Sequence, residues 1–241
     1  MKKTLLLLIS TLLIAAGCTE REAQIITTLE PIADGEWQCF HKEFNLLSPS
    51  SAEMRIAADT KYWLWVNGKL IIREGGLKRG PTPTDSYCDV VTDVNNLKFG
   101  KNEVVVLVQY YGHNSFSHRV TATPGLYFDL DSKLDHIVSD ESWKAIRYDA
   151  MWAAPREDDL KGFRKYRLAG ANVGYDARKA LDFSKDIDSK DWSKAVVVQR
   201  DKSDWGNFVD RPIPFWRWSE LRDYLNIERK DNEIVCKLPY N

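Results

Sequence analysis

The sequence predicts an all-β protein built mainly of antiparallel strands. Short segments alternate between apolar and polar residues, turn residues recur about every 8–12 residues, and no long segment has helical periodicity. The aromatic content is high, with 9 Trp, 10 Tyr and 9 Phe among 241 residues, and this favours β-rich packing. The chain has 34 Lys and Arg and 35 Asp and Glu, so it carries no excess of positive charge. This balance argues against nucleic acid as the main partner.

The N-terminus predicts export. Lys2 and Lys3 precede an apolar run from Leu5 to Ala16, and Gly17-Cys18 follows. A short basic region, an apolar core of this length and small residues at its end are typical of a secretory signal peptide. The run is shorter than the roughly 20 residues that a membrane-spanning helix needs.

The residues Ala15-Ala16-Gly17-Cys18 resemble a bacterial lipobox, in which the cysteine is lipidated and becomes the mature N-terminus. We therefore expect a lipoprotein signal peptide over residues 1–17 and a short tether over residues 18–24. The protein would be anchored through Cys18 in the cell envelope, on the periplasmic or surface face of the outer membrane. An ordinary cleaved signal peptide with an incidental cysteine is the alternative.

The body opens with segments that read as strands. Residues 37–46 are rich in aromatics, and residues 53–58 alternate apolar and polar positions as a half-buried strand does. Residues 62–72 form the clearest local pattern, because Asn67-Gly68 supplies the two positive-φ residues of a type I′ turn between two apolar runs. Trp63 and Trp65 share one face of that hairpin, opposite Tyr62, Leu64 and Val66, so both of its faces are apolar.

Further strands follow at regular intervals. Val104 to Val108 is a β-branched run typical of a strand buried on both faces. Residues 211–214 alternate with prolines and predict an extended linker. Residues 150–178 are less regular and predict an excursion with short helices. The remaining predicted strands are residues 87–94, 125–130 and 195–199, a hairpin-like pair of residues 137–138 and 143–148, and a last hairpin over residues 227–238 with Asp231-Asn232 at its tip.

Chemistry-bearing residues form no recognisable catalytic or metal motif. Cys39, Cys88 and Cys236 have no metal-ligand spacing, and we expect buried thiols with at least one of them free. The histidines, which are His41, His113, His118 and His136, show no catalytic spacing, and acids such as Glu157 to Asp159, Asp182, Asp186, Asp188 and Asp191 read as solvated loop charges.

Several segments in order resemble the N-terminal β-sandwich of bacterial α-L-rhamnosidases of glycoside hydrolase family 78. Together, these segments extend the resemblance over nearly all of the chain from about Trp37 onward. One loop departs from the family, because Thr82-Pro83-Thr84-Asp85 replaces its usual Ala-Arg-Gly-Asp. The segments are Arg55–Tyr62, Leu64–Lys69, Arg79–Pro81, Leu97–Asn102, Tyr110–Gly112, Asp140–Lys144, Gly174–Arg178, Asp191–Ala195, Arg211–Pro214 and Leu238–Asn241.

The resemblance implies a jelly-roll, galactose-binding-like sandwich over residues 25–205, and over residues 206–241 a linker with the first strands of a following β-domain. In the family, two carboxylates about 6.5–9.5 Å apart carry out inverting hydrolysis in an (α/α)6 barrel downstream. No residue here matches that motif, so we assign no catalytic residue, no metal and no cofactor. We expect an accessory portion truncated before the barrel, with a downstream catalytic domain or polypeptide as its partner.

Sugar contact is the remaining expectation. Trp152, Trp205, Trp216 and Trp218 lie in irregular segments, where exposed aromatics are more often functional. They are the candidates for contact with a rhamnose-containing glycan, although packing against further domains is the favoured alternative and packing in the core a second one. A free-standing surface carbohydrate-binding lipoprotein for plant or host glycans is the competing interpretation.

Overall fold

The structure is a computed structural model. It describes residues 22–76, 80–92, 94–114, 119–154, 173–185, 187, 192–199, 204–217, 224–231 and 233–237. Among them there is one short 3-10 turn, Pro49–Ser51, and no α-helix. The strands are β1 (Ile25–Thr27), β2 (Trp37–Leu46), β3 (Glu53–Asp59), β4 (Lys61–Val66), β5 (Lys69–Gly75), β6 (Ser86–Thr92), β7 (Gly100–Gln109), β8 (Gly125–Asp131), β9 (His136–Val138), β10 (Lys144–Arg147), β11 (Met151–Ala153), β12 (Val173–Tyr175), β13 (Ser193–Lys194), β14 (Val196–Val198), β15 (Phe208–Asp210), β16 (Asn226–Lys230) and β17 (Glu233–Lys237).

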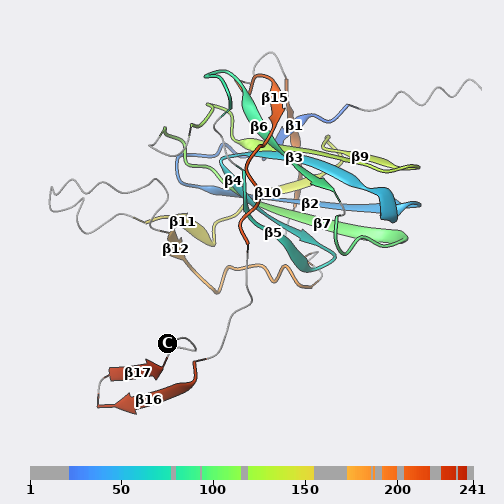
Figure 1. Cartoon of the computed structure of the whole chain (residues 1–241). Helices are drawn as coiled ribbons and strands as arrows, with labels where there is room; N and C mark the ends of the chain where they lie inside the picture. Colours follow the sequence, from blue (N-terminus) through green and yellow to red (C-terminus); the bar gives the residue numbers. More distant parts are fainter. Residues whose placement is uncertain are drawn as a thin grey trace, which may run out of the picture.

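Two large sheets pack as a sandwich (Figure 1). The first sheet has seven strands in the order β14-β1-β8-β3-β6-β15, with β9 beside β8. The second sheet has six strands in the order β13-β10-β2-β7-β4-β5. The chain crosses between sheets from β2 to β3 and back to β4, so neighbours in sequence face each other across the core. The prediction of an all-β sandwich is confirmed.

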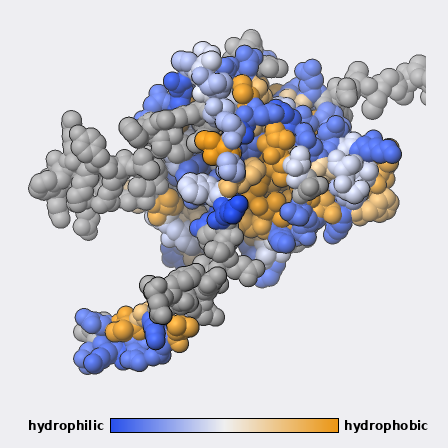
Figure 2. Space-filling model, viewed as in Figure 1, coloured by the Kyte–Doolittle hydropathy of each residue, from blue (hydrophilic) through white to orange (hydrophobic). Residues whose placement is uncertain are grey.

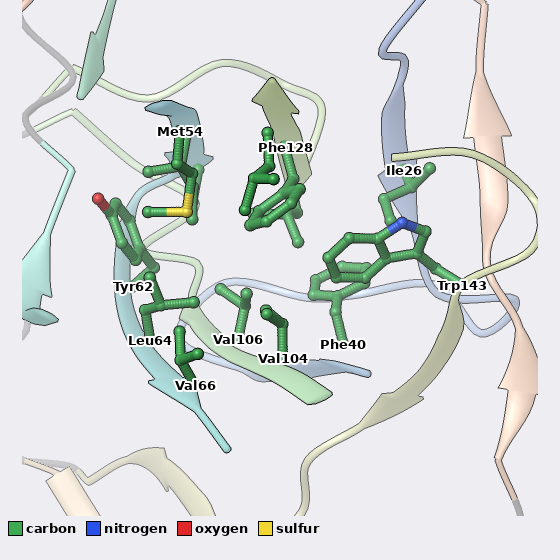
Figure 3. Close-up of a cluster of buried hydrophobic side chains, with 14 of the residues drawn as sticks. Ile26, Phe40, Met54, Tyr62, Leu64, Val66, Val104, Val106, Phe128 and Trp143 are labelled. Carbon is green, nitrogen blue, oxygen red and sulfur yellow. The ribbon is translucent and has the colours of Figure 1, made fainter. Parts of the chain in front are cut away.

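The core between the sheets follows from the alternation read in the sequence. In β4, Tyr62, Leu64 and Val66 point inward and are fully buried, a choice between two apolar faces that the hairpin pattern leaves open. Figure 3 shows them facing Met54 and Phe128 of the first sheet across the core. Burial of apolar side chains contributes roughly 25 cal/mol per Å² removed from water, so the packing of these side chains favours folding.

The second sheet is buried on both of its faces. Every residue from Val104 to Val108 in β7 is buried, which confirms the prediction made from the β-branched run. The outer face holds a second apolar cluster in which Trp63 and Trp65 of β4 pack, with Phe183 and Trp192 from the later chain against it. The Trp65 and Phe183 rings lie 4.3 Å apart between centroids.

The tight turn between β4 and β5 is confirmed. Asn67 has φ 48° and Gly68 has φ 75°, as a type I′ turn requires. The Asn67 side chain also donates to Asn102 Oδ1 at 2.9 Å and accepts from the Glu103 backbone N–H at 2.9 Å. The turn is therefore tied to the start of β7.

One predicted pairing is wrong. Residues 137–138 and 143–148 do not form a hairpin, because β9 pairs with β8 in the first sheet whereas β10 pairs with β2 in the second. The turn between them, held by bonds from Ser142 and Trp143 to Asp140, carries the chain from one sheet to the other. Trp143 then fills the core, where its ring lies 5.0 Å from that of Phe128.

The expected end of the sandwich at residue 205 is also too early. Strand β15 pairs in parallel with β6, with Phe208 opposite Ser86 and Asp210 opposite Cys88, so the first sheet continues through Asp210. In its described parts, the irregular excursion forms a small sheet of β11 and β12. Residues 155–172 of that excursion lie outside the described residues.

The predicted last hairpin is present as β16 and β17, which pair in register from Asn226↔Lys237 to Lys230↔Glu233. The three cysteines described are free, with Cys39 and Cys88 buried as expected and Cys236 partly exposed. No helix in the described ranges has the length and apolarity that a bilayer span requires. The predicted signal peptide and Cys18 lie outside those ranges.

Candidate carbohydrate-contacting surface

The four candidate tryptophans have different environments. Trp216 is 76% exposed and Trp152 is 44% exposed, so both can present an indole face to a ligand. Trp205 is 1% exposed, and its Nε1 donates to the Thr123 carbonyl at 2.8 Å. A ring buried this completely cannot stack on a sugar, so we remove Trp205 from the candidate surface. Trp218 lies outside the described residues.

Trp205 is buried because the segment before β15 docks beside β6. Its ring packs in a small cluster with Ile25, Ala57 and Cys88, and it meets the Phe208 ring edge-on at 6.0 Å between centroids. The irregular sequence around it gave no sign of this, since the parallel pairing that buries it joins residues far apart in the chain.

Trp152 lies on the small β11–β12 sheet, directly opposite Gly174. A Cβ atom added at Gly174 would meet the indole ring at 2.2–2.5 Å, so the ring rests on the glycine backbone. This close approach holds one indole face while 44% of the residue stays exposed. The Ala153 N–H donates to the Gly35 carbonyl at 3.1 Å and so fixes β11 to the sandwich.

A groove of about 330 Å³ runs along β10, next to the edge strand β13. Glu30, Arg147 and Asp149 supply charged donors and acceptors to it, and Leu29, which is 68% exposed, supplies an apolar face. Lys179 reaches Asp149 Oδ2 at 3.1 Å. Neighbouring donors, acceptors and an apolar face are what a sugar requires. The full lining is Thr28, Leu29, Glu30, Ala145, Ile146, Arg147, Asp149 and Ser193.

Trp216 owes its position to a buried ion pair. Arg211 Nε lies 2.8 Å from Oδ1 of Asp89, and the side chains are 6% and 1% exposed. The Arg211 guanidinium also stacks on the Phe215 ring, 4.3 Å from its centroid. These contacts hold residues 211–215 against the first sheet and leave the next residue, Trp216, in solvent.

Asp89 is fully engaged in this anchoring role. Its Oδ2 accepts from the Tyr62 hydroxyl at 2.7 Å and from the Gly76 N–H at 3.0 Å. Burial, with the nearby Asp89 charge, raises the pKa of Tyr62 well above its usual value, so the phenol keeps the proton that it donates. The arrangement binds parts of the chain to one another, through Arg211 at Oδ1 and through Tyr62 and Gly76 at Oδ2.

The loop acids predicted to be solvated charges are described in one case. Asp182 is exposed, and the Lys185 ammonium and the Ser184 hydroxyl and N–H lower its pKa to about 2. A carboxyl of such low pKa stays ionised at neutral pH and cannot deliver a proton as a general acid does. Glu157 to Asp159, Asp186, Asp188 and Asp191 lie outside the described residues.

Sequence reasoning missed one group of side chains. His41 and Glu43 of β2 and Glu103 of β7 place ligand atoms within 4.8 Å of one another. The two-residue spacing of His41 and Glu43 was a visible signal, because it puts both on one face of a strand. The third member could not be seen, since Glu103 joins them only through the register of β2 with β7. His113 is exposed in a loop, and His118 lies outside the described residues.

No family profile and no curated protein sequence matches the chain. Its fold is nevertheless that of part of several solved enzymes. A family 78 rhamnosidase of Bacillus sp. GL1 aligns over 81% of this chain with 24% identity and a TM-score of 0.65. The α-L-rhamnosidases from Aspergillus terreus and Dictyoglumus thermophilum align over 90% and 89%, with TM-scores of 0.59 and 0.57 and identities of 19% and 21%. The matched region spans only 20–25% of the length of these three enzymes.

Proposed function

We propose that the chain is an accessory β-sandwich of an α-L-rhamnosidase-like glycoside hydrolase, with a role that is structural or carbohydrate-contacting, and that it does not hydrolyse glycosides alone. One observation carries the proposal. The sandwich aligns over 81–90% of this chain with one-quarter or less of three rhamnosidases. A unit that forms a small share of such an enzyme is suited to a supporting role in carbohydrate degradation.

Exposed apolar residues near the C-terminal side support docking to further polypeptide. Ile213 and Trp216 follow the Arg211 anchor and are 53% and 76% exposed. Ile227, Ile234 and Val235 of the last hairpin are 52–63% exposed, and Figure 2 shows apolar residues on that hairpin among polar ones. Exposed apolar patches are typical of surfaces that contact another protein, a membrane or a ligand, and a protein partner fits the proposed accessory role.

The proposal includes export and anchoring through Cys18. A glycan-degrading protein held outside the cytoplasm meets polymeric substrates that cannot cross the membrane. Incorporation of labelled palmitate into the full chain, and its loss together with membrane association in Cys18→Ala, tests this part. Equal release of both proteins into the soluble fraction would contradict it.

The alternative is a stand-alone surface protein that binds plant or host glycans. Two features favour it: the groove beside β10, with Glu30, Arg147 and Asp149 in its walls, and the indole of Trp152 held on Gly174. Both provide the polar and apolar contacts that sugars need.

Two measurements on the purified chain separate the readings. An aryl α-L-rhamnoside is incubated with the chain, and we expect no release of the aryl alcohol. Rhamnose-containing oligosaccharides are then titrated while tryptophan fluorescence is followed, with the two exposed candidates changed one at a time, in Trp152→Ala and Trp216→Ala. Turnover of the aryl rhamnoside would overturn the accessory proposal. Saturable binding that depends on Trp152, without turnover, would favour the stand-alone binding protein.

A further inference from the structure

The paired strands β2 and β7 bring three metal-ligating side chains together on one outer face of the second sheet. His41 and Glu43 are two residues apart on β2 and therefore point the same way. Glu103 lies directly opposite Glu43 in the strand register. The ligand atoms of the three residues all lie within 4.8 Å of one another.

The charges at this position favour a cation. Like charges directly opposite each other on neighbouring strands destabilise a sheet, and Glu43 and Glu103 are such a pair. Lys101 Nζ lies 2.6 Å from Glu43 Oε1, but its side chain is 71% exposed, so water screens its charge. A bound cation would relieve the repulsion more effectively than this lysine does.

The imidazole of His41 is buried and points toward the carboxylates of Glu43 and Glu103. The His41 side chain is 1% exposed, and its Nε2 lies 2.8 Å from Glu103 Oε1. Neither ring nitrogen makes a hydrogen bond of good geometry in the described structure. The Trp192 ring, 5.6 Å away between centroids, covers the imidazole. His41 Nε2 is buried, has no well-formed hydrogen bond and faces two carboxylates. These are the properties expected of a metal ligand.

We propose that His41 Nε2 and the carboxylates of Glu43 and Glu103 bind a divalent ion of the Zn²⁺ class. One nitrogen and two oxygens suit zinc, whereas Ca²⁺ and Mg²⁺ prefer shells made of oxygen alone. Three protein ligands leave a fourth position for water on the exposed side, where Glu43 lies. The ion would join β2 to β7, and this site does not depend on the proposed role in glycan degradation.

Titration calorimetry on the chelator-treated full chain tests the site, with Zn²⁺ as the probe and Ca²⁺ and Mg²⁺ as comparisons. We expect one Zn²⁺ per chain and no comparable binding of the other two. The midpoint of thermal unfolding should rise by roughly 5–10 °C at a Zn²⁺ concentration about 100 times the dissociation constant. Co²⁺ in place of Zn²⁺ should give a visible absorption band from a site of low coordination number.

Matched variants locate the ion. His41→Gln and Glu103→Gln should each weaken Zn²⁺ binding by roughly 100-fold or more, since even loss of an outer-shell partner costs about 10–100-fold. His136→Gln is the control, because His136 and Asp129 form a similar pair at 2.9 Å for which the described residues offer no third ligand. Lys101→Gln should tighten binding roughly two- to fivefold by freeing Glu43.

Failure is equally clear. The proposal is wrong if the folded chain binds no Zn²⁺ in a one-to-one ratio. It is also wrong if binding survives in Glu103→Gln and disappears in Cys236→Ser, because the ion would then sit on the thiol. Should His41→Gln fail to fold, the exposed Glu43→Gln carries the same test, and unchanged affinity in that variant would reject the site.

Discussion

The β-sandwich and the C-terminal hairpin obey the same pairing rules but differ in burial. In β2 and β7, long antiparallel strands bury nearly every apolar side chain between the sheets or against the outer cluster. In β16 and β17 the strand register is equally regular, yet none of the described residues is buried. An isolated two-stranded hairpin is marginally stable at best in water. An alternating strand pattern is enough to pair two strands as a hairpin, but a stable folding unit also needs buried apolar side chains.

The largest effect should come from the centre of the sandwich. Trp143 is fully buried, and its Nε1 donates to the Val138 carbonyl at 2.8 Å. Trp143→Ala should lower the free energy of unfolding by about 3–5 kcal/mol, through lost burial and a cavity. Trp216→Ala, at an exposed site, should change it by less than about 0.5 kcal/mol. Equal effects in chemical denaturation would contradict the difference between the two regions.

The next variant tests where the sandwich ends. Arg211→Met removes the buried partner of Asp89 and should cost about 3 kcal/mol. The exposed pair of Arg55 and Asp210, 2.5 Å apart, is the matched control, and Arg55→Met should cost about 0–1 kcal/mol. If Arg211→Met unfolds at the same denaturant concentration as the parent, residues after 210 do not belong to the cooperative unit.

A pH titration tests the burial of tyrosine side chains in the sandwich. Burial, with the Asp59 charge nearby, raises the pKa of Tyr110 from 10.0 to about 12, and burial likewise raises that of Tyr148 to about 12. The unfolded chain therefore loses these protons first, so stability is full below pH 10 and falls as the pH rises from about 10 to about 12. Absorbance of ionised tyrosine should show two phases in the folded protein. A single phase near pH 10, before any unfolding, would contradict this burial.

The smallest effect should come from the hairpin. Ile234→Lys changes a side chain that is 63% exposed, and we expect the sandwich to unfold within about 0.5 kcal/mol of the parent. The same variant should weaken any association of the chain with a downstream domain. A loss of more than about 2 kcal/mol in the isolated chain would show that the hairpin already packs on the sandwich.

Local sequence patterns predicted which segments form strands, but they did not predict which strands pair with one another. The alternation in residues 53–58 and the Asn67-Gly68 turn specify structure within a few residues, and both are confirmed. Which sheet receives β10, and that β15 joins β6, depend on pairings between distant residues. For the same reason the burial of Trp205 was not foreseen. Glu103 lies close to His41 only because of the register between β2 and β7, and a local sequence pattern does not reveal that register.

Hydrogen exchange on the chain tests most directly whether the buried sandwich is stable while the exposed hairpin is not. We expect backbone amides of β2 and β7 to exchange only through global unfolding, and those of β16 and β17 to exchange at rates within about tenfold of an unstructured peptide. Protection of β16 and β17 equal to that of β7 would contradict the claim that regular strand pairing without burial leaves the hairpin only marginally stable.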